Sequence, residues 1–378
     1  MKFYIIAGEA SGDLHASNLM KALKTSDREA EFRCWGGDLM KEAGGEIVKH
    51  YRDLAFMGFA EVIIHLRTIL KNLDFCKKDI LNYKPDALIL VDYPGFNLRI
   101  AEFAHEAGLR VIYYISPQVW AWKRSRVYKI RKFVDKMLVI LPFEKEFYRK
   151  YDFPVEFVGH PLLDVVTRPS GYKDRQDFIS KNQLSGKPVI AVLPGSRKQE
   201  ISRMLPVMAG LSGRFPGYDF VVAAAPSVEE EFYHKLIGDE GLPILNNQTH
   251  ELLRYADAAL VTSGTATLET ALFRVPQVVC YKANELSYQI ARRLVDVKFI
   301  SLVNLVMDRQ VVKELIQADF NPDNLYHELE MVLNETWRKK VIADYDELYG
   351  KLGGEGASSR AADMIHGFLK YKDTLSKA

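Results

Sequence analysis

Cysteine is scarce in this sequence, and its scarcity excludes two kinds of stabilisation. The 378 residues include three cysteines, Cys34, Cys76 and Cys280, which lie far apart along the chain. Three widely spaced thiols can form neither a disulfide framework nor the ligand set of a structural zinc site. We therefore expect a protein of the reducing cytoplasm.

Long apolar runs and an excess of one charge are also missing. No stretch reaches the roughly 18 uninterrupted apolar residues that a membrane-spanning helix needs, so any membrane contact should be peripheral. Glu9 and Asp13 interrupt the apolar start of the chain before the core of a signal peptide could form, so this start is expected to be a strand. With 51 Lys and Arg against 49 Asp and Glu, the net charge is +2. This balance predicts neither a nucleic-acid partner nor an acidic tail.

The residues that are present indicate two α/β domains. Hydrophobic residues make up 48% of the chain and charged residues 26%, which is typical of a folded globular protein. Short β-rich runs alternate with segments of helical period, the pattern of parallel sheets built from strand–helix–strand units. The expected strands are 3–8, 32–36, 87–92, 111–116, 137–141 and 155–159 in the first half, and 189–193, 220–224, 243–245, 258–262 and 278–281 in the second.

The two sets of strands are separated by a polar, irregular stretch from about Thr167 to Gly186, where we expect a linker. The predicted organisation is an N-terminal Rossmann-like domain over residues 1–170 and a C-terminal Rossmann-like domain over 171–345. A helical segment over 346–378 follows, and it could pack back on the N-terminal domain. Ligands of such doubly wound sheets bind beyond the carboxyl ends of the strands, so functional residues should lie in the strand-to-helix junctions.

The first such junction, from Gly8 to Asp13, is rich in small residues. Gly8 and Gly12 would let the backbone approach a ligand next to Glu9, while Ser11 or Asp13 could cap the helix that follows. A tight turn with a helix cap explains the same residues equally well. The junction lacks the Gly-x-Gly-x-x-Gly fingerprint of dinucleotide-binding proteins, which argues against a hydride-transfer enzyme.

A junction in the second half favours an anionic ligand. Gly195 and Ser196 place free backbone amides at a helix N-terminus, and Arg197 adds a planar cationic fork that matches phosphate oxygens. This combination predicts a diphosphate site. The alternative is a capped turn whose Arg197 points to solvent.

The next junction has the same form, with hydroxyls on both sides of a glycine in Ser263, Gly264 and Thr265. Its amides and hydroxyls could bind phosphate, and Glu269, one turn inside the helix, could accept hydrogen bonds from two ribose hydroxyls. The alternative is a capping box that starts at Thr265 or Ala266 and is completed by Glu269. Two anion-ready loops in one domain favour a nucleotide diphosphate as the joint explanation.

In the first half, Asp92 ends a hydrophobic strand and is followed by a Tyr-Pro-Gly turn. It is expected to point into the crevice where ligands of such sheets bind, where it could take a proton from an acceptor hydroxyl. An Asp that caps its own turn explains the pattern as well. Further on, Trp120 and Trp122 follow a strand end, where tryptophans form either a binding wall or a satellite of the core.

These motifs, taken in series, resemble those of the lipid-A-disaccharide synthases, a family of inverting glycosyltransferases with the GT-B architecture. The matching stretches, in chain order, are 7–13, 92–97, 116–122, 141–144, 157–160, 193–197, 263–269 and 301–305. Several motifs in series are far more specific than one glycine-rich loop, because such loops recur in other GT-B enzymes. The resemblance implies two doubly wound Rossmann-like domains that face an interdomain cleft.

The resemblance also implies a reaction in lipid A biosynthesis. A 2,3-diacylglucosamine would pass from its UDP derivative to the 6-hydroxyl of 2,3-diacylglucosamine 1-phosphate, with release of UDP. By position, Asp92 resembles the general base, and Glu269 resembles the carboxylate that holds ribose. Arg197 and Asn304 resemble contacts on the UDP side, and Gln317 is expected beside them.

Paired carboxylates of the metal-binding Asp-x-Asp kind are missing after the strands, so Arg197 and helix dipoles would stabilise the departing diphosphate. We expect neither a metal nor a cofactor. Another UDP-sugar GT-B enzyme or a UDP-sugar epimerase would share the loops of the second half and stays an alternative. A non-catalytic nucleotide-sugar-binding or membrane-scaffold protein is a second alternative, and a homodimer is left open. The Asp92 and Trp120 motifs favour the lipid A enzyme.

The N-terminal half carries two features that suit acylated substrates. Residues 123–136 hold seven Lys and Arg against one Asp, a local charge of +6, and residues 54–73 are unusually apolar. A solvated charged face and a core helix explain each feature alone. Together they predict peripheral docking on an anionic lipid surface, at the cytoplasmic face of the inner membrane.

Overall fold

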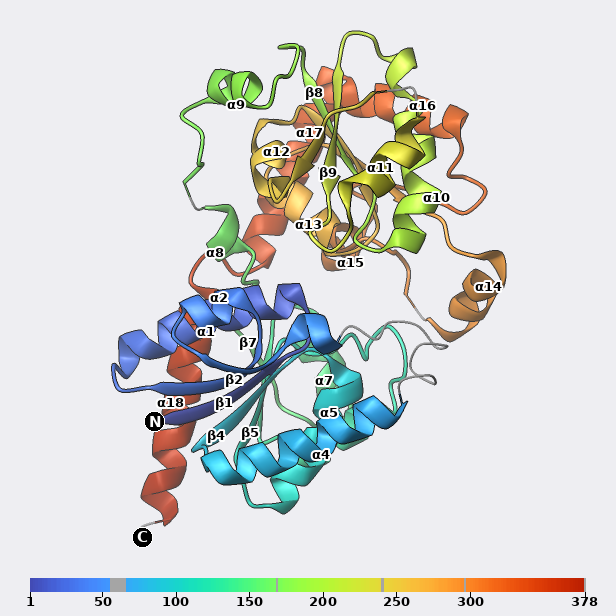
Figure 1. Ribbon diagram of the computed structural model, residues 1–378. Coiled ribbons are helices and arrows are strands. Elements are labelled where there is room, and N and C mark those ends of the chain that lie inside the picture. Colours follow the sequence, from blue (N-terminus) through green and yellow to red (C-terminus); the bar gives the residue numbers. More distant parts are fainter. Residues whose placement is uncertain (55–65, 168, 239–240, 296, 377–378) are drawn as a thin grey trace. The chain divides into compact units, whose positions relative to one another are not determined.

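The computed structural model describes residues 1–54, 66–167, 169–238, 241–295 and 297–376 (Figure 1). Contacts divide the chain into two compact units. Unit 1 comprises Met1–Asp164 and Leu352–Ala378, and unit 2 comprises Val165–Lys351. Over the described residues, unit 1 holds a seven-stranded sheet and unit 2 a six-stranded sheet, and their neighbouring strands pair in parallel. This confirms the predicted α/β class with two doubly wound sheets.

The sheet of unit 1 has the strand order β3-β2-β1-β4-β5-β6-β7. Its strands are β1 (Lys2–Ala7), β2 (Glu31–Gly36), β3 (Glu46–His50), β4 (Ala87–Val91), β5 (Val111–Tyr114), β6 (Lys136–Val139) and β7 (Glu156–Phe157). Its helices are α1 (Ala10–Ser26), α2 (Asp38–Glu42), the 3₁₀ turn η1 (Tyr51–Leu54), α4 (Leu66–Tyr83), α5 (Pro94–Glu106), α6 (Arg126–Phe133), α7 (Glu144–Arg149) and α18 (Ala357–Ser376), with α8 (Leu163–Val166) at the boundary to unit 2.

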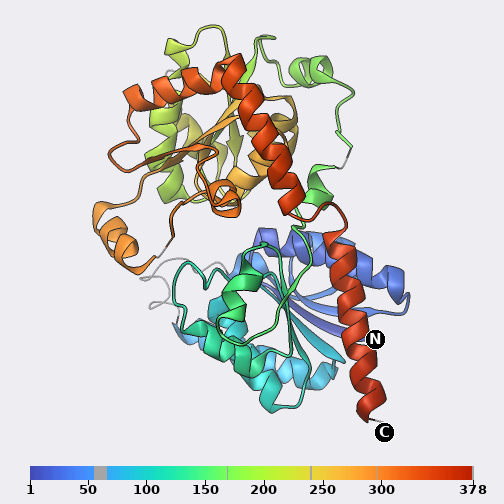
Figure 2. The same ribbon diagram turned by 180° about the vertical axis from the view of Figure 1, so that it is seen from behind.

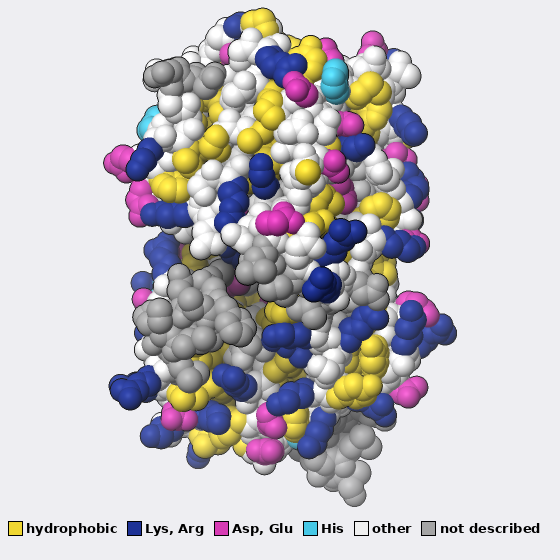
Figure 3. Space-filling model, turned by 90° about the vertical axis from the view of Figure 1, so that its right-hand side faces the viewer, with side chains coloured by type: hydrophobic (Ala, Val, Ile, Leu, Met, Phe, Trp, Pro, Cys, Tyr) yellow, Lys and Arg dark blue, Asp and Glu magenta, His cyan; other side chains and the backbone are white. Residues whose placement is uncertain are grey.

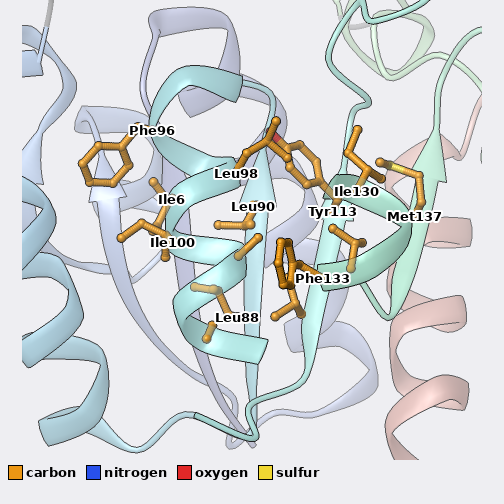
Figure 4. Packing of buried hydrophobic residues seen from close by; sticks show 14 of the residues in the cluster. Ile6, Leu88, Leu90, Phe96, Leu98, Ile100, Tyr113, Ile130, Phe133 and Met137 are labelled. Carbon is orange, nitrogen blue, oxygen red and sulfur yellow. The ribbon is translucent and has the colours of Figure 1, made fainter. Parts of the chain in front are cut away.

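Helices α4, α5 and α6 share one hydrophobic core with the sheet of unit 1 (Figure 4). Strand β4 is buried at every position, because a central parallel strand is covered on both faces. Its Leu88 and Leu90 pack on this side together with Phe96 and Ile100 of α5. Phe3 alternates to the opposite face, where its ring meets His366 of α18 edge-on and α18 packs along α1.

The C-terminal helix α18 belongs to unit 1 and lies against its sheet in both ribbon views (Figure 2). Asp164 accepts hydrogen bonds from the amides of Gly356 (2.6 Å) and Ser358 (3.1 Å), which satisfies donors at the start of α18. Arg360 donates through Nε to the carbonyl of Val158 at 2.8 Å. The preceding helix α17 ends at Lys351 in unit 2, so the chain returns to unit 1 at Leu352.

The sheet of unit 2 has the strand order β10-β9-β8-β11-β12-β13. Its strands are β8 (Val189–Leu193), β9 (Asp219–Ala224), β10 (Ile244–Asn246), β11 (Ala258–Thr262), β12 (Gln277–Tyr281) and β13 (Lys313–Ile316). Its helices are α9 (Arg175–Lys181), α10 (Lys198–Ala209), the 3₁₀ turn η2 (Ser212–Arg214), α11 (Glu230–Ile237), α12 (Thr249–Tyr255), α13 (Thr265–Leu272), α14 (Glu285–Leu294), α15 (Leu302–Met307), α16 (Pro322–Leu333) and α17 (Glu335–Lys351). Alternation along β8 sends Ile190 and Val192 into one core and Val189 and Ala191 into the other.

Three features differ from the sequence prediction. Strands β3 and β13 were not predicted, and both lie at an edge of their sheet, where strands are short and polar. The expected linker from Thr167 to Gly186 contains a helix, α9, whose first turn is capped because Asp174 accepts the amide of Asp177 at 2.9 Å.

Of the helices described here, none has the length and apolar character needed to cross a membrane.

Candidate active site

The junctions predicted to be functional lie at the point in each sheet where the strand order reverses. In unit 1 the order reverses between β1 and β4, whose junctions carry residues 8–13 and 92–97. In unit 2 it reverses between β8 and β11, whose junctions carry residues 194–197 and 263–269. Such a switch point opens a crevice at the carboxyl edge of a doubly wound sheet. Each unit therefore brings two of the predicted loops side by side.

Asp92 follows β4 in a strained turn that is held from several sides. Asp92 has a φ of +44° and Tyr93 a φ of +46°, in the left-handed region that is costly for residues other than glycine. The Asn97 side chain donates to the backbone carbonyls of Asp92 (2.8 Å) and Val91 (3.2 Å). The Tyr113 hydroxyl also donates to the Asp92 carbonyl. These hydrogen bonds restrain the backbone from which the Asp92 side chain projects.

Two effects raise the pKa of the Asp92 carboxyl to about 7. Burial is the larger, and the negative charge of Glu9 is the second, while a hydrogen bond from the Tyr93 backbone acts in the opposite direction. Glu9 stands just before α1, in the loop that follows the neighbouring strand β1. A carboxyl whose pKa is near neutrality can take up and release a proton at physiological pH, as a general base must.

Close packing requires glycine at position 8 of the first loop and leaves little room for a side chain at position 12. A Cβ on Gly8 would lie 2.4 Å from the Cγ of Tyr93, and a Cβ on Gly12 would lie 3.2 Å from the Cβ of Ala7. The two loops at the switch point of unit 1 are therefore in contact through Gly8 and Tyr93. Ser11 is exposed in the first turn of α1.

Asp13 has a structural role within the same loop and helix. Its Oδ1 accepts the amides of Gly37 (2.7 Å) and Met40 (3.1 Å), and its Oδ2 accepts the amide of Leu39 (3.1 Å). This carboxylate therefore satisfies the donors at the start of α2. The predicted cap of α1 by Ser11 or Asp13 is wrong, because the N-cap is Glu9 and its side chain makes no capping hydrogen bond.

In unit 2, the Gly195 turn is occupied by a carboxylate that the sequence analysis missed. Glu200 accepts the Ser196 amide through Oε2 at 3.3 Å and pairs with Arg197 Nη1 through Oε1 at 3.1 Å. Gly195 has a φ of +112°, and a Cβ there would lie 2.9 Å from Glu200 Oε2. Glu200 thus lies at the position where an anionic ligand would meet the amide and the guanidinium. Arg197 is 58% exposed, so its side chain is open to solvent.

The junction after β11 begins its helix earlier than a capping box through Glu269 would require. The N-cap of α13 is Gly264, Thr265 is the first helical residue, and the Thr267 hydroxyl donates to the Gly264 carbonyl at 2.8 Å. The alternative of a capping box completed by Glu269 is therefore wrong. Glu269 instead lies 3.7 Å from Nε2 of His250, a partner on α12. Gly264 and Thr265 are exposed, and a Cβ on Gly264 would enter open space.

Asn304 is buried, and its amide is engaged within unit 2. Its Nδ2 donates to the carbonyl of Val312 (2.9 Å) and to Oε1 of Glu314 (2.8 Å). Its Oδ1 accepts the amides of Val311 (2.7 Å) and Val312 (3.0 Å). The Asn304 side chain therefore holds the segment before β13 in place.

Glu314 connects this segment to the junction after β11. Its carboxylate accepts the amides of Ile300 and Ser301, both at 3.0 Å. The Ser263 hydroxyl donates to the Ile300 carbonyl at 2.9 Å. Ser263, Ile300 and Glu314 thus form one connected network beside Gly264.

Gln317 is engaged in a similar way with the loop after β12. Its Oε1 accepts the Ala283 amide (2.6 Å), and its Nε2 donates to the Ala283 carbonyl (3.4 Å) and to Oε2 of Glu285 (3.0 Å). Its backbone amide donates to the Tyr281 carbonyl at 2.8 Å. Gln317 and Asn304 are therefore placed to position loops of the candidate donor site.

The two tryptophans after β5 lie in different environments. Trp120 is buried, and its ring meets that of Phe143 edge-on with centroids 5.0 Å apart. Trp122 is 42% exposed, and Lys123 Nζ and Arg126 Cζ lie 4.5 and 5.5 Å from the centroid of its ring. Trp120 thus belongs to the core, and Trp122 lies at the surface.

In the part of the chain that the structure describes, no three His, Cys, Asp or Glu side chains come together as a metal site would require. The ionisable groups described above instead come together in pairs. Asp92 interacts electrostatically with Glu9, and Arg197 forms an ion pair with Glu200.

Comparison with known proteins separates the alternatives that the loops leave open. Two solved structures share the fold at low identity: a putative UDP-N-acetylglucosamine 2-epimerase from Listeria monocytogenes (TM-score 0.66, 15% identity, 99% of this chain and 96% of that one) and the glycotransferase of kitacinnamycin (TM-score 0.66, 16% identity, 97% and 99%). These likenesses show the GT-B fold, which epimerases and glycosyltransferases share.

Sequence comparison is more specific. The family model described as lipid-A-disaccharide synthetase matches residues 3–366. The lipid-A-disaccharide synthase of Syntrophus aciditrophicus is 41% identical over 377 residues, covering 98% of both chains, and that of Trichlorobacter lovleyi is 39% identical over 372 residues, covering 96% of both. The epimerase and non-catalytic alternatives are therefore not favoured. The chain belongs to the lipid-A-disaccharide synthase family of glycosyltransferases.

Proposed function

We propose that this chain transfers a 2,3-diacylglucosaminyl group from UDP to the 6-hydroxyl of 2,3-diacylglucosamine 1-phosphate, and that Asp92 is the general base. Family membership supports the reaction. The observation that supports the residue assignment is the position and acidity of Asp92. Its carboxyl lies at the switch point of unit 1 and has a pKa of about 7.

The proposed step is a direct displacement with inversion. The acceptor oxygen attacks the anomeric carbon, its proton passes to the Asp92 carboxylate, and the bond from the anomeric carbon to the diphosphate oxygen breaks. UDP leaves with that electron pair. A base with a pKa near 7 is deprotonated in a large fraction of molecules at neutral pH and is still basic enough to accept the proton. The restrained backbone of the turn around Asp92 limits the positions open to the base, which favours such a step.

On the donor side, we propose that the Ser196 amide and Arg197 bind the diphosphate and stabilise the charge that develops on it. Glu269 is the candidate for the ribose hydroxyls, and the exposed Gly264 and Thr265 are candidates for further phosphate contacts. The resemblance suggested Asn304 and Gln317 as UDP contacts as well. Their amide groups are engaged internally, so we propose that both act by positioning the loops.

The assay that tests this proposal combines the purified chain with the diacylated UDP donor and the 1-phosphate acceptor and detects the disaccharide by mass spectrometry. We expect Asp92→Asn to lose about 10²- to 10⁴-fold in turnover, the usual contribution of a positioned base, and to keep its UDP affinity. Asp74→Asn, an exposed acid of the same unit, is the matched control and should behave as the parent. Near-parental turnover of Asp92→Asn would contradict the assignment.

We further propose that unit 1 docks peripherally on anionic lipid at the cytoplasmic face of the inner membrane. Among the basic residues between 123 and 136, Lys129 pairs with Glu102, Arg131 with Asp152 and Lys136 with Glu156. The positive charge of this run is therefore partly neutralised. One view of the surface shows Lys and Arg side chains interspersed with apolar side chains on the face of unit 1 turned to the viewer (Figure 3).

Trp122 is the best-placed anchor for such docking. It is exposed beside Lys123 and Arg126, and an indole flanked by cations suits the boundary between headgroups and acyl chains. Helix α4 adds exposed Leu70 and Phe75. Most of the apolar segment predicted over 54–73, residues 55–65, lies outside the described residues.

Co-sedimentation with vesicles tests this part. We expect binding to vesicles rich in anionic phospholipid, weaker binding at high salt, and little binding to zwitterionic vesicles. The triple variant Trp122→Ser, Lys123→Ser, Arg126→Ser should bind several-fold less. A variant with Lys187→Ser and Lys235→Ser removes two exposed charges from unit 2 and should bind as the parent. If the triple variant binds as well as the parent does, docking occurs elsewhere.

A further inference from the structure

The hydroxyl of Thr262 differs from those of two other buried threonines in unit 2. Thr262 is the last residue of β11 and is 6% exposed. Its Oγ1 is buried and makes no hydrogen bond with any residue that the structure describes. The hydroxyls of Thr267 and Thr270, by contrast, donate to the carbonyls of Gly264 and Ala266, both at 2.8 Å. Core packing alone therefore does not explain the hydroxyl of Thr262.

A buried hydroxyl without a partner lowers the stability of the fold. It loses its hydrogen bonds to water on burial and gains none in return, whereas a valine side chain has the same shape and carries no such penalty. Buried polar groups of native proteins almost always have a partner, so an exception points to a group outside the chain itself. The place of Thr262 in the sheet indicates what that group is.

Alternation along β11 directs the Thr262 side chain toward α10. Leu260 packs in the core that also contains Ile201 of α10. Thr262 lies two residues beyond Leu260, so it is on the same face of the sheet, at the carboxyl edge. Its Cγ2 lies 3.6 Å from the place that a Cβ on Gly195 would take. The side chain therefore lies against the turn that precedes α10.

Thr262 and Glu200 flank the same space beside this turn. The Cβ that Gly195 lacks would lie 2.9 Å from Glu200 Oε2 on one side, with the Thr262 methyl on the other. This oxygen of Glu200 accepts the Ser196 amide at 3.3 Å, and its second oxygen pairs with Arg197. A diphosphate that replaces the carboxylate at the amide and the guanidinium would therefore bring phosphate oxygens next to Thr262.

We propose that Thr262 is a donor-binding residue, whose hydroxyl turns toward Gly195 and donates a hydrogen bond to an oxygen of the UDP diphosphate. The inference rests on the proposed binding of UDP in unit 2. One rotation about χ1, from one staggered rotamer to another, brings the hydroxyl to the position of the methyl. Strand β11 thus supplies a third hydrogen-bond donor, beside the Ser196 amide and Arg197 from the turn after the neighbouring strand β8.

The test compares Thr262→Val with Thr270→Val, which removes a hydroxyl that has a partner within its own helix. Calorimetry measures the binding of UDP and of uridine, which carries no phosphate. We expect Thr262→Val to bind UDP about tenfold more weakly, the usual loss of a hydrogen bond to a charged group, and to bind uridine as the parent does. Thr262→Ser keeps the hydroxyl and should stay within about threefold of the parent affinity for UDP, as should Thr270→Val.

Thermal unfolding without UDP separates a ligand contact from a structural role. Thr262→Val removes a hydroxyl without a partner, so its unfolding midpoint should rise by about 2–4 °C. Thr270→Val removes a hydroxyl that donates to the Ala266 carbonyl and should show no such rise. Weaker UDP binding together with a higher midpoint is the result expected for Thr262→Val.

Parental UDP affinity in Thr262→Val would overturn the inference. A lower unfolding midpoint would overturn it as well, because the hydroxyl would then have a partner in the free protein. If Thr262→Val does not fold, Thr262→Ala removes the same hydroxyl and allows the same comparison of UDP with uridine. If the parent itself binds no UDP, the proposed function is wrong, and the diphosphate contact is wrong with it.

Discussion

Glu9→Gln is the substitution that tests most directly how this site makes a base. The pKa of Asp92 is raised from an ordinary value of 3.8 to about 7, with burial as the larger cause and the charge of Glu9 as the second. Glutamine keeps the size of Glu9 and removes its charge. Burial remains, so the pKa of Asp92 should fall by the smaller share, about one pH unit, which is typical for the loss of one nearby charge.

The pH profiles of kcat/KM for the parent and for Glu9→Gln are expected to cross. With the acidic limb moved from about 7 to about 6, the deprotonated fraction of Asp92 at pH 5.5 rises about eightfold. A base weaker by one pH unit loses about threefold in intrinsic reactivity if proton transfer is half complete in the transition state. Activity in kcat/KM should therefore rise about two- to threefold at pH 5.5 and fall about threefold above pH 8.

The assay is initial-rate disaccharide formation at low acceptor concentration between pH 5 and 9, for the parent, Glu9→Gln and Glu29→Gln. Glu29 is an exposed acid of the same unit, and its variant controls for a general change in net charge. An acidic limb that stays at about 7 in Glu9→Gln would refute the coupling between the two carboxyls. A uniform loss of activity at every pH would show that Glu9 acts by binding substrate instead.

Three further outcomes are expected. Arg197→Ala should weaken UDP binding about tenfold or more by calorimetry, the usual loss of a hydrogen bond to a charged group, and Arg197→Lys should recover only part because a point charge does not replace a bidentate fork. Glu200→Gln should tighten UDP binding several-fold, because its carboxylate lies on the Ser196 amide and Arg197 and repels the diphosphate, whereas Glu229→Gln at an exposed ion pair should not. Gly8→Ala should lower the free energy of unfolding by about 1–3 kcal/mol in urea titrations, because its Cβ would collide with the Tyr93 ring.

The fold could be predicted from sequence because buried parallel strands have an unmistakable pattern. Strands such as β4 and β11 are apolar at nearly every position, since helices cover both faces of the sheet. Edge strands lack this pattern. Strands β3 and β13 are half-buried and carry charged residues, so their sequences resemble those of loops, and their pairing depends on neighbours that are distant in sequence.

The candidate site was predictable to the extent that it lies at strand ends. Asp92, Arg197 and Glu269 follow strands whose carboxyl edges could be located, so their neighbourhood followed from topology. Glu200 could not be found in this way. It is an ordinary helical acid by sequence, and only the three-dimensional arrangement shows that its carboxylate accepts the Ser196 amide.

A residue in a family motif need not contact the ligand. In this chain, the hydrogen bonds of each side chain distinguish structural residues from candidate ligand contacts. Asn304 and Asp13 stand in motifs that resemble those of a glycosyltransferase, yet their side chains are engaged by backbone groups of their own unit. A side chain that accepts two or three backbone amides cannot turn to a ligand without leaving those amides unsatisfied, at a cost of about 1–3 kcal/mol each. Arg197 is under no such constraint, because it is exposed and its described partner, Glu200, is an anion that a diphosphate can replace. In the donor loops, most motif residues are therefore held by hydrogen bonds within unit 2, whereas Arg197 can exchange one anion for another. Such an arrangement lowers the reorganisation needed to bind the donor and to stabilise a leaving group.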